Sequence, residues 1–109
     1  MNRVLLIISF LVTSLSFAAG DPIAGKKKAG QTCQSCHGMD GLGINNTYPK
    51  LAGQFADYMV KALSDYKTGE RKNPIMSGFA SSLSEQDIEN VAAYYSRLTV
   101  GKLHDLDMN

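Results

Sequence analysis

Apolar residues recur at helical spacing in the middle of the chain. Starting at Phe55, they occupy positions i, i+3, i+4, i+7, i+8 and i+11, while polar residues such as Asp57 and Lys61 occupy the opposite face. This period predicts an amphipathic helix that begins near residue 55 and is ended by Gly69. Its apolar stripe consists of Phe55, Tyr58, Met59, Ala62, Leu63 and Tyr66.

An earlier helix is predicted by its start signal. Asp21 suits the N-cap position, and Pro22 suits the first helical position, where no backbone N–H is required. The residues that follow, from Ile23 to Ala29, favour a helix. We therefore expect the first helix over residues 22–36.

The last helix has the clearest start signal of the chain. Ser84 is a good N-cap, Asp87 stands three residues later as in a capping box, and Leu83 is placed to pack against Ile88. One face of this helix is apolar, and we expect it to pack against the core. This face consists of Ile88, Val91, Ala92, Tyr95 and Leu98.

The segments between these helices contain turn-forming residues and no apolar period. Residues 38–54 are rich in glycine and asparagine, and we expect an irregular loop there. Residues 70–82 contain Asn73-Pro74, and the residue before a proline is disfavoured in helices, so we expect a second loop, which carries Met76. No stretch of useful length alternates as a β-strand does. The sequence therefore predicts an all-α fold with long connecting loops.

The N-terminus has the pattern of a secretory signal peptide. A positive charge at Arg3 precedes the apolar run of residues 4–12, which is shorter than the ~20 residues that a membrane-spanning helix needs. Small residues near the end of this region suit a signal peptidase, and we expect cleavage after Ala18 or after Gly20. The pattern predicts export to the periplasm without stable membrane insertion.

The sequence divides into three parts: a signal peptide over residues 1–20, one folded domain over residues 21–101 and a loosely held tail over residues 102–109.

The full chain has 109 residues, with 11 basic and 10 acidic side chains. So small a net charge gives no reason to expect a nucleic-acid partner. A domain of this size buries a modest fraction of its surface, so a staple or a large apolar cofactor would help its stability.

The motif that carries chemistry is Cys33-Gln34-Ser35-Cys36-His37, which contains both cysteines of the chain. On a helix, at about 100° per residue, the two thiols and the imidazole point into one arc of about 100°, so one flat ligand can meet all three. Covalent haem attachment requires this arrangement, with two thiols that add to the vinyl groups of the porphyrin and an imidazole that reaches the iron. We therefore expect one haem c, bound through Cys33 and Cys36, with His37 on the iron.

Two other uses of these residues fit the sequence less well. A disulfide or thiol-disulfide site suits an exported protein, but it needs no histidine after the second cysteine, and the chain lacks the βαβ pattern of thioredoxin-like proteins. A zinc site needs four ligands, and the motif offers three, with His104 far away in sequence.

With these residues the chain resembles the class I c-type cytochromes, close to the cytochrome c-553 proteins and to one half of a dihaem cytochrome c4. The resemblance covers nearly the whole chain after the signal peptide. The matching segments are Cys33–Gly38, Tyr48–Gln54, Asn73–Ala80 and Leu83–Leu98.

The resemblance implies a class I cytochrome c fold, with helices wrapped around one covalently attached haem. It also implies that His37 is the proximal ligand of the iron, that Met76 is the distal ligand and that the carbonyl of Pro49 takes the Nδ1 proton of His37. In this family a glycine also lets the first and last helices approach each other, and Gly25 and Tyr94 (or Tyr95) match that crossing.

Position along the chain also favours Met76 as the sixth ligand. It follows His37 by 39 residues, which is enough chain to reach the opposite face of a haem. Met39 is too close to His37, and Met59 falls on the apolar stripe, where a core role is expected. His104 is the alternative ligand, and it implies a lower potential because a thioether favours ferrous iron more than an imidazole does.

The expected function is one-electron transfer in the periplasm by a monomeric carrier. The resemblance implies redox protein partners such as a terminal oxidase, a reductase or a dehydrogenase. Two permanent ligands leave no open site on the iron, so no enzyme activity is expected. The alternatives are a haem-based sensor with a labile Met76 and a thiol-disulfide protein that uses Cys33 and Cys36. The run Lys26–Lys28 fits a solvated helix face better than a docking site for an acidic partner.

Overall fold

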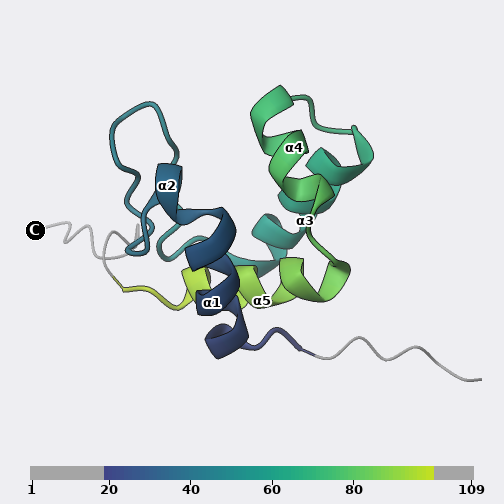
Figure 1. Ribbon diagram of the computed structural model, residues 1–109. Coiled ribbons are helices and arrows are strands. Elements are labelled where there is room, and N and C mark those ends of the chain that lie inside the picture. The colour runs from purple at the N-terminus through teal and green to yellow at the C-terminus, as the bar shows by residue number, and fades with distance from the viewer. Residues whose placement is uncertain (1–18, 100–109) are drawn as a thin grey trace, which may run out of the picture.

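The computed structural model describes residues 19–99, and this part of the chain is helical, with no β-strand (Figure 1). The all-α fold predicted from the sequence is confirmed. The predicted signal sequence up to residue 18, and His104 in the predicted tail, lie outside the described residues. Within residues 19–99 the helices are α1 (Pro22–Thr32), α2 (Gln34–His37), α3 (Ala56–Thr68), α4 (Pro74–Ser81) and α5 (Glu85–Ser96).

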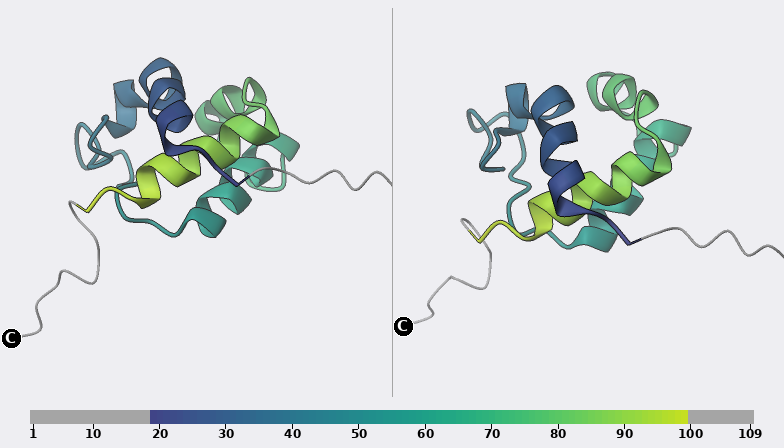
Figure 2. Two further views of the ribbon diagram at one scale, coloured as in Figure 1. Left: turned by 90° about the horizontal axis from the view of Figure 1, so that it is seen from below. Right: turned by 60° about the horizontal axis from the view of Figure 1, so that its bottom comes forward.

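Helices α1 and α5 cross each other, and this crossing is the most extensive helix contact in the described chain (Figure 2). Gly25 lies at the crossing, where an added Cβ would stand 1.9 Å from the carbonyl oxygen of Asn90, so no side chain fits there. The Asn90 side chain also accepts a hydrogen bond from the backbone N–H of Asp21, at 2.8 Å. The predicted approach of Gly25 to the last helix beside Tyr94 is therefore confirmed.

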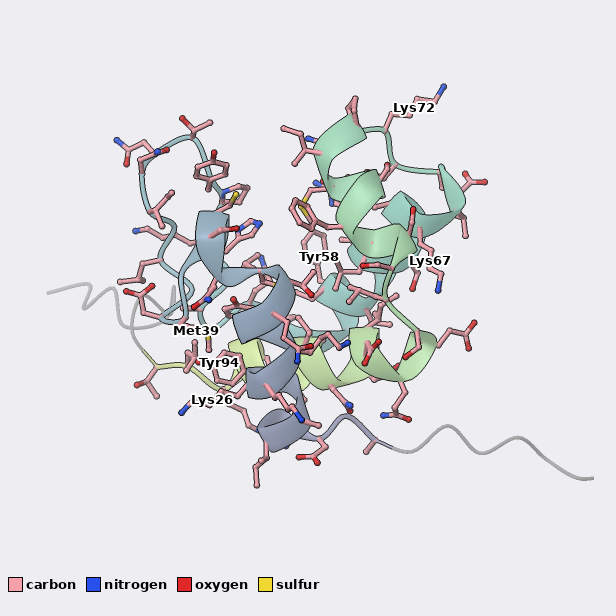
Figure 3. The ribbon with its side chains drawn as sticks, in the orientation of Figure 1. Lys26, Met39, Tyr58, Lys67, Lys72 and Tyr94 are labelled. Atoms are coloured by element: carbon pink, nitrogen blue, oxygen red, sulfur yellow. The ribbon has the colours of Figure 1, made fainter. Side chains whose placement is uncertain are left out.

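The buried core lies where α1, α3 and α5 meet. Tyr95 is fully buried in it, and its hydroxyl donates to the carbonyl oxygen of Gly38 at 2.9 Å. The hydroxyl of the neighbouring Tyr94 donates to the carbonyl oxygen of Met39 at 2.7 Å (Figure 3). The two tyrosines hold the chain that follows α2 against α5. The core cluster consists of Ala29, Met59, Val91, Ala92 and Tyr95.

Helix α4 corrects the prediction of a loop over residues 70–82. The Asn73-Pro74 step, which predicts a break, instead begins the helix. Asn73 has the extended backbone that a following proline favours, with φ −155° and ψ 113°, and this is also an N-cap conformation. Pro74 takes the first helical position, where its missing N–H removes no hydrogen bond. Met76 therefore lies in the first turn of a helix rather than in an irregular loop.

The remaining helix ends differ from the prediction by a few residues. The helix predicted over residues 22–36 is divided at Cys33 into α1 and α2. Helix α3 begins one residue after Phe55 and ends at Gly69, whose left-handed φ of 87° suits a glycine. Helix α5 begins after Ser84 with the predicted capping box complete. None of the helices within residues 19–99 is long and apolar enough to cross a membrane.

Candidate functional site

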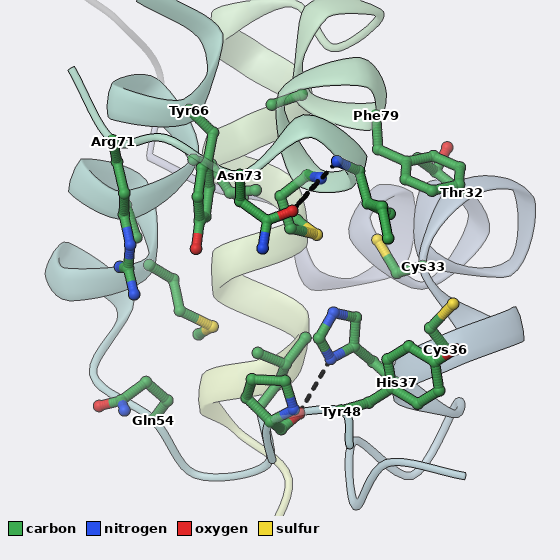
Figure 4. Close-up of a pocket in the computed structure, with 18 of the residues that line it drawn as sticks. Thr32, Cys33, Cys36, His37, Tyr48, Gln54, Tyr66, Arg71, Asn73 and Phe79 are labelled. Carbon is green, nitrogen blue, oxygen red and sulfur yellow. Dashed lines mark hydrogen bonds between the residues drawn. The ribbon is translucent and has the colours of Figure 1, made fainter. Parts of the chain in front are cut away.

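A cavity of about 360 Å³ lies between the segment around α2 and the pair of helices α3 and α4 (Figure 4). Its volume falls within the roughly 300–1,000 Å³ of typical ligand pockets. Most of the side chains that line it are apolar or aromatic. Every residue of the predicted site reaches it: the lining includes Cys33, Cys36, His37, Pro49 and Met76.

The two cysteines enter the cavity from the break between the first two helices. Cys33 is the residue at which α1 ends, and Cys36 lies on α2, one helical turn later. Both thiols are free and half-buried. Burial raises the pKa of the Cys33 thiol to about 11, so this thiol is protonated at neutral pH. A thiol-disulfide site requires a low-pKa thiolate instead, so this environment does not favour that alternative.

The imidazole of His37 is buried and held in one orientation. Its Nδ1 atom lies 2.9 Å from the carbonyl oxygen of Pro49 (Figure 4). A carbonyl oxygen only accepts, so Nδ1 carries the proton, and Nε2 keeps the lone pair that a metal requires. The ring of Tyr48 stands edge-on to the imidazole, with the two ring centroids 6.4 Å apart. The site therefore presents an imidazole of fixed orientation beside the two thiols.

The opposite wall of the cavity explains the apolar stripe predicted on the third helix. Residues of this stripe face the cavity as well as the protein core, and Met59 does both, with 5% of its surface exposed. Phe55 is the exception. It precedes α3 at the N-cap position and is 78% exposed, so its predicted place in the stripe is wrong. The stripe residues that line the cavity are Tyr58, Met59, Ala62, Leu63 and Tyr66.

Met76 reaches the cavity from the first turn of α4. The side chain of Asn73 accepts hydrogen bonds from the backbone N–H groups of Ile75 and Met76, at 3.1 Å and 3.0 Å. Together with Pro74, this cap fixes the backbone that carries the thioether. Met39 does not line the cavity but packs against the core cluster. Of the methionines in residues 19–99, Met59, which is a core residue, and Met76 therefore line the cavity.

Sequence reasoning missed Arg71, which lies at the edge of the cavity in the connection between α3 and α4. Its Nη1 atom donates to the hydroxyl of Tyr58 at 3.3 Å, and its guanidinium carbon lies 4.9 Å from the centroid of the Tyr66 ring. The hydrogen bond to Tyr58 is the main cause that raises the pKa of Arg71, so this side chain stays cationic. No periodic pattern marks a residue in a connection, so the sequence offered no signal for it.

These residues fit the group that the C-x-x-C-H motif implies. Paired thiols and an oriented imidazole share one wall, a thioether approaches from another helix, and the space between them is apolar. Such a cavity suits a porphyrin better than a bare ion. Within residues 19–99, no group of three or more His, Cys, Asp or Glu side chains is arranged to hold a metal ion directly.

Comparison with known proteins agrees with this geometry. Residues 23–99 match the family model Cytochrome c. The chain is 41% identical over 105 residues to cytochrome c4 of Pseudomonas aeruginosa, an alignment that covers 93% of this chain and 52% of that protein. It is 46% identical over 81 residues to cytochrome c-554(548) of Halomonas halodenitrificans, which covers 72% of this chain and 96% of that protein.

Two further comparisons concern a solved structure and a relative with a named role. The solved structure of cytochrome c4 from Acidithiobacillus ferrooxidans superposes with a TM-score of 0.68 and 31% identity, over 76% of this chain and 52% of that one. The chain thus spans about half the length of the cytochromes c4 that it matches. A "thiosulfate dehydrogenase electron acceptor" of Stutzerimonas stutzeri is 41% identical over 70 residues, which is 63% of this chain and 32% of that protein.

Proposed function

Because the chain belongs to the cytochrome c family, we propose that it carries single electrons in the periplasm through a haem ligated by His37 and Met76. Haem c, bound covalently, is the cofactor of this family. The observation that carries the proposal is that Cys33, Cys36 and His37 line the same apolar cavity as Met76. When bound there, haem c supplies an iron centre that changes its oxidation state by one electron.

Each residue of the site has a distinct task in this proposal. The thiols of Cys33 and Cys36 would hold the porphyrin edge covalently, as thioethers. The Pro49 carbonyl keeps the proton on Nδ1 of His37, which leaves Nε2 to bind iron and makes the ring a stronger ligand. The thioether of Met76 favours the ferrous state and so raises the potential. The apolar lining excludes water and holds both oxidation states in one geometry.

The local structure around Met76 favours a carrier over a haem-based sensor. A sensor needs a distal ligand that leaves the iron readily, whereas Met76 stands in a capped helix turn next to Asn73 and Pro74. A haem iron held by both His37 and Met76 would have no free coordination position for a substrate, so we propose no enzyme activity.

Export, the domain limits and the partners are also part of the proposal. The signal pattern of residues 1–20 supports a periplasmic location for a domain over residues 21–101. The relative named as an electron acceptor of thiosulfate dehydrogenase supports a redox enzyme as the donor. A dehydrogenase, a reductase or a terminal oxidase would each meet the monomeric carrier in brief encounters with small interfaces.

The first experiment is the visible spectrum of the full chain expressed in a host that matures c-type cytochromes. We expect sharp low-spin bands that change on reduction, and haem that stays with the chain after denaturation and solvent extraction. The variants Cys33→Ala and Cys36→Ala should each lose most of this haem, whereas Met39→Leu, outside the cavity, should retain it. A colourless protein, or normal haem content in both cysteine variants, would overturn the proposal.

A second experiment separates the carrier from the sensor. Carbon monoxide is added to the native ferrous protein, and the spectrum is followed. A carrier with a firmly bound Met76 should show no change until the protein is denatured. Formation of the carbon monoxide complex under native conditions would instead establish a labile distal ligand and favour the sensor.

A further inference from the structure

The first turn of α4, which carries Met76, has its backbone donors bound by a single residue. The side-chain oxygen of Asn73 accepts hydrogen bonds from the N–H groups of Ile75 and Met76, at 3.1 Å and 3.0 Å (Figure 4). The backbone carbonyl of Asn73 accepts from the N–H of Ser77 at 2.8 Å. Pro74 has no N–H to satisfy. The backbone donors of this turn therefore depend on Asn73.

The buried contacts of this segment lie beyond the first turn. Ala80 and Leu83 are buried, with 0% and 3% of their surfaces exposed, whereas Pro74 is exposed and Met76 is half-buried. A segment with few buried contacts opens locally at a lower free energy than the core does. The first turn of α4 can therefore open while Ala80 holds the rest of the helix in place.

The position of the Met76 backbone matters because the side chain is flexible. A methionine has three rotatable bonds, so its own torsions do not fix where the sulfur atom lies. The thioether can stay at one point of the cavity only if the backbone that carries it is held. For Met76 that hold is the hydrogen bond from its own N–H to the side chain of Asn73.

We propose that Asn73 is a positioning residue that keeps Met76 on the haem iron, because its cap sets how often the first turn of α4 opens. This inference rests on the proposed function and adds to it the step that makes the iron accessible. Loss of the cap should leave the covalent attachment intact, since Cys33 and Cys36 enter the cavity from the break between α1 and α2.

Imidazole added to the ferric holoprotein is the probe, because it can bind the iron only while Met76 is released. Its apparent affinity is then proportional to the fraction of open molecules, and a titration followed in the visible spectrum measures it. Asn73→Ala removes the cap, whereas Asn73→Ser keeps an oxygen at the N-cap position. The matched control is Ser84→Ala, which removes the N-cap of α5, where the Ser84 side chain accepts from the N–H of Asp87 at 3.0 Å.

We expect Asn73→Ala to raise the apparent affinity for imidazole about fivefold, which is the effect of losing a typical N-cap. Asn73→Ser should stay within about twofold of the wild type. Asn73→Ala and Ser84→Ala should both lower the denaturant concentration at the midpoint of unfolding, but Ser84→Ala should leave the affinity unchanged. Asn73→Gln keeps the amide and displaces its oxygen by one methylene, so it should resemble Asn73→Ala. If the alanine variant does not mature, Asn73→Gln decides the question against the same control.

Wild-type affinity in Asn73→Ala would overturn the inference. An equal rise in Ser84→Ala would also overturn it, because the opening would then involve the whole domain.

The variant Met76→Ala separates this outcome from a failure of the proposed function. It should bind imidazole much more tightly than the wild type does, and adding Asn73→Ala to it should change nothing, since no thioether remains to be released. If Met76→Ala binds tightly but Asn73→Ala behaves as the wild type, only the role of Asn73 fails. If Met76→Ala binds imidazole no better than the wild type, the proposed ligation by Met76 fails as well.

Discussion

The Nδ1 atom of His37 lies 2.9 Å from the carbonyl oxygen of Pro49, twelve residues further along the chain. The loop between them is held by its own backbone hydrogen bonds, among them Gly43 N–H to the His37 carbonyl at 2.8 Å and Leu51 N–H to the Gly41 carbonyl at 2.7 Å. An irregular loop thus has a defined task, because it brings a carbonyl to the buried side of an imidazole. This orients the ring without a second ionisable group.

The variant Pro49→Ala distinguishes the role of the backbone carbonyl at position 49 from the role of the proline ring. The carbonyl remains, so we expect the low-spin spectrum and the midpoint potential of the holoprotein to be unchanged. The unfolded chain gains freedom, so the free energy of unfolding should fall by about 0.4–1 kcal/mol. Denaturant unfolding monitored by the haem spectrum measures this. A change in the axial ligands would mean that the pyrrolidine ring itself holds the loop in register.

Gly25 and Gly30 in α1 offer a matched pair for the crossing of the terminal helices. A Cβ at position 25 would stand 1.9 Å from a backbone carbonyl of α5, whereas at position 30 its nearest neighbour is the Met39 sulfur at 3.9 Å. We expect Gly25→Ala to lower the free energy of unfolding by about 3 kcal/mol, because α1 must move away from α5. Gly30→Ala should raise it by about 0.5–1 kcal/mol, because alanine favours a helix.

Both free energies can be measured by chemical denaturation of the ferric holoprotein. A crossing that tolerates Gly25→Ala with a loss below 1 kcal/mol would show that the two helices separate easily. That result would conflict with the close approach of α1 to Asn90.

The elements that the sequence predicts well are those whose signal is local. The capping residues Ser84 and Asp87 define where α5 begins, and the C-x-x-C-H spacing places three groups on one short segment without any knowledge of the fold. Helix α4 was not predicted, because Asn73-Pro74 is compatible with both the end and the beginning of a helix. Which of the two occurs depends on the residues that follow and on packing against α3.

Long-range contacts account for the part of the site that sequence reasoning missed. Arg71 stands in a connection without periodicity, and its orientation depends on Tyr58 and Tyr66, which reach it from two turns of α3. The apolar stripe of α3 indicated a buried face, yet a pattern of apolar positions does not distinguish a face that packs on protein from one that lines a cofactor cavity. The exposed Phe55 shows the same limit at the end of the pattern.

Met76 and Met59 permit a direct test of the distal ligand. The variant Met76→Ala should keep its covalent haem, have a lower midpoint potential and bind added ligands such as carbon monoxide, because the sixth position becomes open. Met59→Leu removes the other methionine of the cavity with little change in volume, and it should keep the wild-type potential. Spectroelectrochemistry on both variants decides whether Met76 or Met59 is the distal ligand. An unchanged potential in Met76→Ala would move the distal ligand to another residue.

The hydroxyl of Tyr95 makes the free energy of unfolding depend on pH in the alkaline range. Burial is the main cause that raises the pKa of Tyr95 far above the value of about 10 in an unfolded chain. Between these two values the folded state holds a proton that the unfolded state releases. The number of protons bound is then lower in the unfolded state, so the free energy of unfolding falls as the pH rises above about 10.

The variant Tyr95→Phe should remove this dependence at a small loss of stability near neutral pH. The carbonyl of Gly38 loses the bond from the hydroxyl at 2.9 Å but keeps one from the N–H of Gly41 at 3.2 Å, so we expect a loss of about 1 kcal/mol at pH 7. Above pH 10 the free energies of unfolding of wild type and variant should converge, because only the wild type has this tyrosine to ionise on unfolding. Denaturant unfolding of the ferrous holoprotein from pH 7 to pH 11 tests this, since Cys33 is a thioether there and does not titrate. Parallel curves over this range would mean that the Tyr95 hydroxyl meets water in the folded protein.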